Sequence, residues 1–358
     1  MSEYVYVLHD QGAPSHYQGL EEILNNQNKK LVFREFNILR KLAKSLRYLD
    51  ARLFYKQLIN LAFLFTLIFT KRKTIVLGIA PFDLKLIILG ILLKKHDVYY
   101  HTSHPNWAEN ANFPHKRFIS FEYLRSYWKS FLREKVKHIF TVTNSAKKSL
   151  IENNYSRSEN ISVVFHSFTH SDFFSISTAK SSEEIKFIFT GRLIPSKGVN
   201  LLLNFFSENP RAHLTIIGDG ELKELVIEFA NKYDNITYLG YIGSKKELAE
   251  QYRAHHYLAL PSIKQPYWEE LFGMVIIEAM ACGVVPICTN HAGPKEIISE
   301  GIDGFLVDEE NYEQKLNEVI ESHTNLTFLE KSEHAISTSS RYTTENISKL
   351  WEKISIKS

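Results

Sequence analysis

The sequence feature that most restricts the fold of this chain is a repeated alternation between short β-branched or aromatic runs and stretches with helical periodicity. Such alternation is typical of βαβ units, in which parallel strands are covered by helices. In the first half it predicts strands at 4–8, 31–36, 74–79, 98–101 and 138–143. In the second half it predicts strands at 185–190, 213–217, 236–239, 256–260 and 285–289, with helices that include 221–233 and 274–282. We therefore expect an α/β protein that is doubly wound twice.

The length of 358 residues favours two domains, because single cores rarely grow beyond roughly 250 to 300 residues. A polar stretch at 167–182, which includes STAKSSEE, is the predicted linker. We place the first domain at 1–168 and the second at 169–342, and expect one more helix over 343–354.

Composition excludes several classes of protein. Hydrophobic residues make up 44% and charged residues 23% of the chain, as in soluble globular proteins. The two cysteines, Cys282 and Cys288, have no histidine or second cysteine pair at zinc-like spacing, so neither a disulfide framework nor a metal site is predicted. The N-terminus lacks the pattern of a signal peptide, and we expect a cytoplasmic protein.

The small net charge of +3 conceals a strong asymmetry. Residues 1–170 contain 25 Lys and Arg against 13 Asp and Glu, whereas the remainder is acidic. A basic half attracts nucleic acid or anionic lipid by its long-range field. Because the half lacks any recognisable nucleic-acid-binding motif, we predict no nucleic-acid partner.

The stretch 38–56 reads as a basic amphipathic helix. Its leucines follow one stripe, and Arg40, Lys44 and Arg47 follow another. The uncharged run at 57–70 is shorter than the roughly 20 residues of a spanning helix. We expect no span across the bilayer, and weigh peripheral binding to an anionic membrane surface against an ordinary packed helix with a solvated face.

Two glycine-containing loops in the second half suit an anionic ligand. FTGRLIPSKG follows a predicted strand and contains Gly191, Arg192 and Lys197, a planar cation and a point charge that can share a diphosphate. IIGDGELKELV has Gly218 between a strand and a helix, so that backbone N–H groups face the same edge. Taken alone, each loop also fits a plain solvated turn.

The segment EELFGMVIIEAMACGVVP places two carboxylates in apolar surroundings. Burial of a carboxylate is costly unless a partner binds it. If 274–282 is a helix, the unpaired N–H groups at its start can bind a phosphate. Glu278, one turn inside, can accept hydrogen bonds from paired hydroxyls such as those of a ribose, and Glu270 faces the other end of the ligand.

Together these segments resemble the retaining family 4 glycosyltransferases of GT-B fold, which belong to the glycosyl transferases group 1. The resemblance rests on RLIPSKG, IGDG, LGYIG, LPS, the two glutamates of ELFGMVIIEAMACGVVP and HAGPKEII, in order and with family-like spacing. It implies two Rossmann-like doubly wound domains facing across a cleft, with a C-terminal helix, here 343–358, that crosses back to the first domain.

The resemblance also implies roles for single residues. Arg192 and Lys197 would bind the donor diphosphate, Glu270 the transferred sugar and Glu278 the ribose. Backbone N–H groups of Phe272, Gly273 and Met274 would complete the site as its phosphate-binding groups. His101, in YYHTSHPNW, matches the active-site histidine of the family, and His104 is the competing candidate. On the acceptor side the chain departs from the pattern. Only Gly12 of the glycine pair is present in HDQGAPS, and His166 and Ser167 replace the usual asparagine and glycine at the hinge.

The activity implied is transfer of a hexose from a nucleotide diphosphate sugar, UDP- or GDP-linked, to a glycan or polyprenyl-linked glycan. No Asp-x-Asp motif occurs, so the reaction is expected to need neither metal nor cofactor. Frequent Asn, Lys and Ile suggest a bacterial source and a surface polysaccharide product. Two alternatives remain: a non-catalytic subunit of the same fold that binds a nucleotide sugar, and a module that binds acidic lipid or nucleic acid through the basic half alone.

Overall fold

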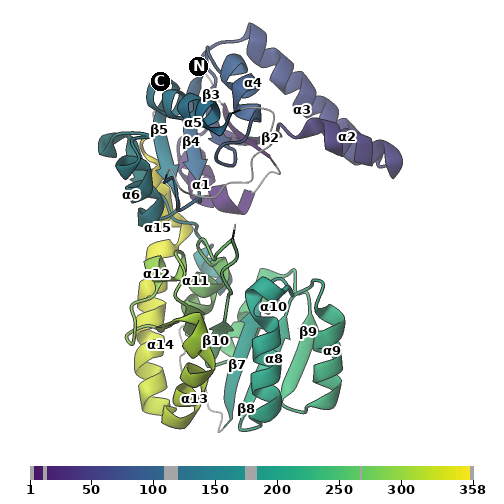
Figure 1. Ribbon diagram of the computed structural model, residues 1–358, viewed down its shortest axis with the longest axis vertical. Coiled ribbons are helices and arrows are strands. Elements are labelled where there is room, and N and C mark those ends of the chain that lie inside the picture. Colours follow the sequence, from purple (N-terminus) through teal and green to yellow (C-terminus); the bar gives the residue numbers. More distant parts are fainter. Residues whose placement is uncertain (1–3, 11–13, 109–119, 174–183, 267, 355–358) are drawn as a thin grey trace. The chain divides into compact units, whose positions relative to one another are not determined.

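The computed structural model describes residues 4–10, 14–108, 120–173, 184–266 and 268–354. The chain forms two compact units (Figure 1). The N-terminal unit combines Met1–Ser167 with Glu345–Ser358, and the C-terminal unit is Phe168–Thr344. The division falls one residue before the boundary predicted at 168 and two residues after the one predicted at 342.

A six-stranded parallel sheet forms the centre of the N-terminal unit, in the order β2-β1-β3-β4-β5-β6. Its strands are β1 Tyr4–His9, β2 Lys30–Glu35, β3 Thr74–Gly78, β4 Asp97–Thr102, β5 Val136–Thr141 and β6 Ile161–Val163. Its longer helices are α1 Gln18–Asn26, α2 Ile38–Arg47, α3 Ala51–Phe69, α4 Lys85–Leu92, α5 Phe121–Ser130 and α6 Asn144–Glu152. The strand order reverses between β1 and β3, so the carboxyl ends of these strands border a topological switch point.

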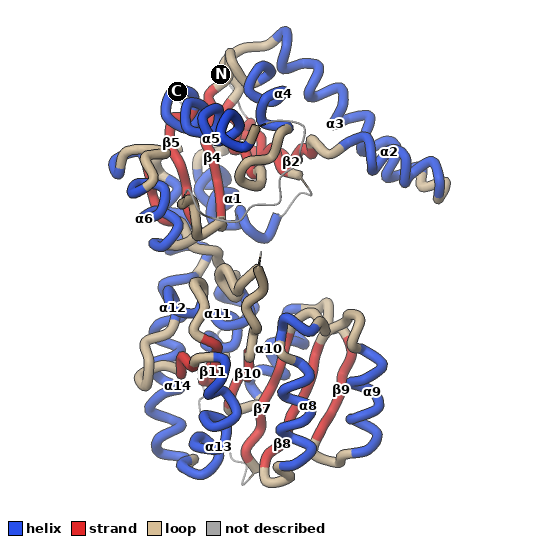
Figure 2. Tube along the Cα trace, viewed as in Figure 1, coloured by secondary structure: helices blue, strands red, loops and turns tan. Residues whose placement is uncertain are grey.

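A second six-stranded parallel sheet forms the C-terminal unit, in the order β12-β11-β10-β7-β8-β9 (Figure 2). Its strands are β7 Ile185–Thr190, β8 Ala212–Ile217, β9 Ile236–Gly240, β10 Tyr257–Leu260, β11 Val285–Thr289 and β12 Phe305–Val307. Its helices include α7 His170–Phe173, α8 Val199–Glu208, α9 Lys223–Lys232, α10 Lys245–Arg253, α11 Met274–Ala281, α12 Pro294–Ile297, α13 Tyr312–Ser322 and α14 Asn325–Ser339. This order is that of a Rossmann sheet, with the switch point between β7 and β10.

The expected α/β class and double winding are confirmed, and the differences are local. The two three-residue edge strands β6 and β12 were not predicted, because three residues are too few to show a period. The helix expected over 343–354 is shorter: α15 spans Thr344–Ser348 and a 3-10 turn follows at Lys349–Trp351. Its side chains still pack inside the N-terminal unit, where Trp351 is buried.

The predicted linker begins as folded structure. The Phe168 N–H donates to the Tyr342 carbonyl at 3.1 Å, and the Thr344 N–H donates to the Phe168 carbonyl at 3.0 Å. The two segments in which the chain passes from one unit to the other are therefore hydrogen-bonded to each other. The short helix α7 then packs into the C-terminal unit, where the Cys282 thiol donates to the carbonyl of Phe173 at 2.9 Å. The linker prediction was therefore wrong for 168–173, and its remainder lies largely outside the described residues.

The single amphipathic helix predicted over 38–56 is also wrong. The first helix, α2, ends at Arg47, and Leu49 has a left-handed φ of 51°. The Asp50 side chain accepts a hydrogen bond from the Leu53 N–H at 2.9 Å and so caps a second helix, α3. The uncharged run at 57–70 belongs to this helix of 19 residues, the one described helix that is long and apolar enough to cross a membrane by length and composition alone.

Candidate active site

Loops from three neighbouring strands meet at the carboxyl edge of the C-terminal sheet. The Leu193 N–H donates to the Asp219 carbonyl at 2.9 Å, which joins the loop after β7 to the loop after β8. Gly218 is required at this junction because a Cβ there would lie 1.8 Å from the carbonyl oxygen of Gly191. The two glycine loops predicted from sequence are therefore packed backbone against backbone.

The loop after β10 lies on the other side of the same switch point. The Ile263 N–H donates to the Ser196 carbonyl at 2.8 Å, which ties this loop to the one that contains Lys197. Farther along, a Cβ on Gly293 would lie 2.3 Å from the Phe272 nitrogen, so the loop after β11 packs directly against the start of α11. Only glycine allows this close approach.

Lys197 and Glu270 are brought together as an ion pair between their Nζ and Oε2 atoms. The Glu270 residue is only 9% exposed, and its Oε2 also accepts a hydrogen bond from Ser262 Oγ at 3.2 Å. The Lys197 ammonium lies 5.1 Å from the ring centroid of Trp268. Arg192 is exposed and has no ion pair within the described part of the chain, so its guanidinium is available to a ligand.

The backbone of Glu270 is fixed by a chain of contacts that the sequence analysis missed. Its N–H donates to His291 Nδ1 at 3.1 Å, and His291 Nε2 lies 2.9 Å from a carboxylate oxygen of Glu309. The Gly293 N–H donates to the Glu270 carbonyl at 2.9 Å. HAGPKEII was noted as a motif, but nothing in its spacing indicates that its histidine orients a glutamate 21 residues earlier.

At the start of α11, Gly273 occupies the N-cap position with φ 91° and no side-chain cap. Phe272 and Gly273 are buried, and Met274 begins the helix. The first N–H groups of an uncapped helix, together with its dipole, attract an anion. Helix α11 thus starts four residues after Glu270, whose side chain pairs with Lys197, and the expected phosphate-binding N–H groups of Phe272 to Met274 lie at this start.

Glu278 occupies a different environment on the same helix. Burial raises the pKa of its carboxyl to about 7; Lys245 opposes this shift and Asp172 adds to it. Lys245 and Asp172 form an ion pair of 3.5 Å with each other. The hydroxyl of Tyr252, whose pKa is raised by burial and by Glu278, completes the surroundings. The sequence analysis did not identify these three neighbours, because they come from α7 and α10.

Replacing Glu278 by Gln should stabilise the free protein at alkaline pH. A carboxyl whose pKa rises from 4.5 to about 7 on folding favours the folded state when protonated, and this contribution is lost as pH rises from about 4.5 through 7. Between pH 5 and 8 the variant should gain about 2 to 3 kcal/mol in unfolding free energy relative to wild type. Chemical denaturation at both pH values measures this. If the variant and wild type differ in unfolding free energy by the same amount at pH 5 and pH 8, Glu278 does not titrate as described.

The N-terminal unit places His101 at the carboxyl end of β4, 5% exposed. Its Nδ1 lies 3.2 Å from the Tyr17 hydroxyl, and its Nε2 has no hydrogen-bond partner among the described residues. Rings of Trp351 and His166 lie 5.5 and 6.3 Å away, and the centroids of the tilted His16 and His166 rings are 4.2 Å apart. His166, noted as a departure at the hinge, and His16 therefore form one cluster of imidazoles with His101.

These imidazoles are held neutral. Burial, with smaller contributions from His16 and His9, lowers the pKa of His101 to about 3. Burial and His9 lower the pKa of His16 to about 4. A neutral imidazole can exchange hydrogen bonds with uncharged hydroxyl groups at physiological pH.

The other candidates of this half are less informative. His104 is half-buried beyond the end of β4, and its carbonyl accepts a hydrogen bond from the Trp107 indole at 3.0 Å. Gly12 lies outside the described residues. Within the described ranges, no group of three or more His, Cys, Asp or Glu is placed to hold a metal ion.

Comparison with known proteins assigns a family to the second half of the chain. Residues 171–341 match the family described as glycosyl transferases group 1. A protein of the cps region of Klebsiella pneumoniae, described as uncharacterized, is 34% identical over 151 residues, which are 42% of this chain and 40% of that protein. An uncharacterized glycosyltransferase of Methanocaldococcus jannaschii is 31% identical over 136 residues, 37% of each protein. The matches thus span well under half the length of these relatives.

The fold extends beyond the matched half. The structure of Anabaena HepE in complex with UDP covers 97% of this chain and of its own, with a TM-score of 0.66 and 16% identity. At this identity the likeness establishes the architecture alone. Both six-stranded units together therefore have the GT-B fold of glycosyltransferases.

Proposed function

Because residues 171–341 belong to the glycosyl transferases group 1 family, we propose that this chain transfers a hexose from a UDP- or GDP-linked donor to a glycan or lipid-linked glycan. The observation that carries the proposal is the Lys197–Glu270 pair at the switch point between β7 and β10. In open α/β sheets, ligands bind outside the carboxyl ends of the strands at such a point. A buried ion pair there keeps both charges satisfied until a ligand replaces each partner.

Each side chain has a distinct part in the proposed donor complex. Lys197 exchanges Glu270 for a phosphate oxygen, and exposed Arg192 binds the diphosphate from the other side. The freed Glu270 carboxylate accepts hydrogen bonds from hydroxyls of the sugar. N–H groups from Phe272 to Met274 face the second phosphate, and ionised Glu278 binds the ribose. HepE, a protein of the same fold, has been crystallised with UDP and with UDP-glucose, which supports a donor of this class.

The proposed reaction retains the configuration at the sugar carbon. The bond between that carbon and the diphosphate breaks, and the acceptor hydroxyl bonds to the carbon from the same face. Its proton passes to the departing phosphate oxygen. Arg192, Lys197 and the start of α11 stabilise the charge that develops on the diphosphate, which is the largest contribution that such a site makes to rate. His101, neutral and with a free Nε2, would bind a sugar hydroxyl.

The acceptor and the cellular location are proposed from the matched relative of Klebsiella pneumoniae. A relative is encoded in a cps region, and we propose that the product is a surface polysaccharide made in the bacterial cytoplasm or on the cytoplasmic face of the inner membrane.

Release of nucleoside diphosphate from a panel of nucleotide sugars tests the proposed function. We expect one donor to be hydrolysed slowly without acceptor and faster with a matching glycan, at rates that a metal chelator does not change. If no nucleotide sugar releases nucleoside diphosphate faster with the protein than without it, the chain belongs to the non-catalytic alternative. Loss of turnover with chelator would overturn metal independence alone.

A further inference from the structure

One face of α3 is apolar and exposed along its whole length. Only 22% of its most apolar 18-residue stretch is buried. Residues of this face that are at least 38% exposed are Tyr55, Leu58, Ile59, Leu61, Phe65, Ile68 and Phe69. Side chains of Ile88 and Ile91 on neighbouring α4 are 65% and 71% exposed. Monomeric soluble proteins rarely expose so continuous an apolar surface without a partner.

Helix α2 continues this surface and adds positive charge. Leu39 and Leu46 are 81% and 63% exposed, and Leu49 in the turn to α3 is 90% exposed. Arg40, Lys44 and Arg47 lie on the adjacent exposed stripe. We call α2 and α3 together the apolar arm; it extends from the rest of the N-terminal unit (Figure 1).

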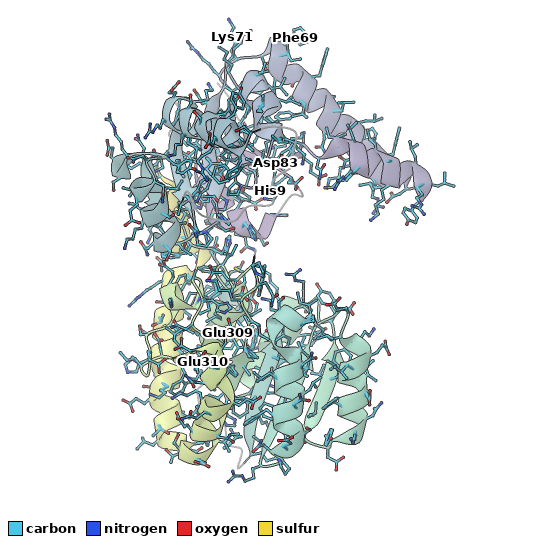
Figure 3. All side chains as sticks on the ribbon, viewed as in Figure 1. His9, Phe69, Lys71, Asp83, Glu309 and Glu310 are labelled. Atoms are coloured by element: carbon cyan, nitrogen blue, oxygen red, sulfur yellow. The ribbon has the colours of Figure 1, made fainter. Side chains whose placement is uncertain are left out.

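The charge around the apolar arm has one sign. Residues 38–73 contain nine Lys and Arg and a single acid, Asp50. Lys71 follows Phe69 at the far end of α3, so that a cation stands beside an exposed aromatic ring (Figure 3). Apolar side chains flanked by cations are complementary to a lipid surface with anionic headgroups.

The buried face of the arm is fixed to the sheet by a polar network. Glu35, at the end of edge strand β2 and 4% exposed, accepts hydrogen bonds from Lys41 of α2 at 2.8 Å and from Lys56 of α3 at 2.9 Å. Gln57 also donates to this carboxylate, at 3.0 Å, and the Glu35 N–H donates to Asn60. Both helices are thus held in one orientation by a single carboxylate.

This attachment decides between spanning a membrane and lying on it. The chain enters the arm from β2 and leaves it into β3, both strands of the same sheet. Helix α2, at 1.5 Å per residue, is about 15 Å long and cannot return the chain across a bilayer core of about 30 Å. A spanning α3 would also pull Gln57 and Asn60 from their buried partners.

We propose that the apolar arm binds an anionic lipid bilayer with α2 and α3 parallel to its surface, the exposed apolar face among the acyl chains and the Arg40 stripe at the headgroups. This proposal rests on the function proposed above, because binding to a membrane would bring the enzyme to a lipid-linked acceptor. Its contacts are confined to the N-terminal unit and do not depend on the donor site.

Flotation of the full chain with phosphatidylglycerol–phosphatidylcholine vesicles tests the proposal. Wild type should float with these vesicles and not with phosphatidylcholine alone. The variant Phe65→Ser/Phe69→Ser should lose binding at all salt concentrations, because it removes inserted surface. Neutralising Arg40, Lys44 and Arg47 to Gln should weaken binding on the order of 100-fold at low salt, since each cation contributes a factor of about five.

Matched controls separate this result from unfolding and from the catalytic proposal. Tyr241→Ser/Leu326→Ser removes two exposed apolar side chains, 76% and 78% exposed, from the C-terminal unit and should bind vesicles as wild type does. Donor hydrolysis in solution should be unchanged in the Phe65→Ser/Phe69→Ser variant. The proposal would be overturned if wild type does not float. It would also be overturned if wild type forms a dimer through the apolar arm, the Phe65→Ser/Phe69→Ser variant is monomeric, and neither protein binds vesicles. Absence of turnover with intact flotation would overturn only the proposed activity.

Discussion

Glu270→Gln and Lys197→Ala should each lower kcat/KM for transfer by about 10²- to 10³-fold, the usual effect of removing one preorganised charged group from such a site. Glu270→Gln keeps the size of the side chain but weakens its acceptance of sugar hydroxyls. Lys197→Ala removes the point charge from the diphosphate and leaves the 9%-exposed Glu270 without its cation. Steady-state kinetics with the donor found in the panel measures both.

The double variant sharpens this prediction. Because the two side chains are paired in the free protein, their effects should be less than additive. Lys232→Ala, an exposed lysine of α9 in the same unit, is the matched control and should keep wild-type kinetics. If either single variant retains activity within about twofold of wild type while folded, the assignment of the donor site is wrong.

Trp351→Ala should destabilise the N-terminal unit by about 3 to 5 kcal/mol, the range for truncating a fully buried Trp. The indole is 1% exposed and packs against Tyr17, His101 and Phe140 at ring distances of 6.1, 5.5 and 4.5 Å. These contacts join the C-terminal segment of the chain to Tyr17 and to strands β4 and β5 of the N-terminal unit. Denaturant unfolding followed by signals from each unit measures the effect.

The neighbouring residue provides the control for this variant. Leu350 is 38% exposed, and Leu350→Ala should change the unfolding free energy by less than about 1 kcal/mol. A Trp351→Ala protein as stable as the Leu350→Ala protein would show that the segment Glu345–Ser358 is not an integral part of the N-terminal unit.

The fold was predictable where hydrophobic patterns repeat. Strands β7 and β11, which consist mostly of β-branched and other apolar residues, were predicted with the bounds they have. The helix break at Leu49 was not predicted, because the apolar stripe continues through the turn and conceals a local cap at Asp50. Short edge strands leave no periodic signal, so β6 and β12 were missed.

The site was predictable to the extent that it is local in sequence. Glycine loops, paired cations and carboxylates before a helix are visible as spacing, and the structure brings Lys197 to Glu270 across 73 residues. The contacts that orient these groups are long-range and leave no spacing signal. His291 behind Glu270 and Lys245 beside Glu278 are examples, as is Glu35, whose burial between two helices depends on the packed structure.

The central claim is that the loops after β7 and β10 bind a nucleoside diphosphate. Calorimetric titration of the wild-type chain with UDP, GDP, UMP and GMP tests it most directly. We predict that one diphosphate binds at a single site, at least about tenfold more tightly than its monophosphate, and that Arg192→Ala and Lys197→Ala abolish this preference. Absence of binding by both diphosphates, or equal affinity for mono- and diphosphate in wild type and both variants, would contradict the account.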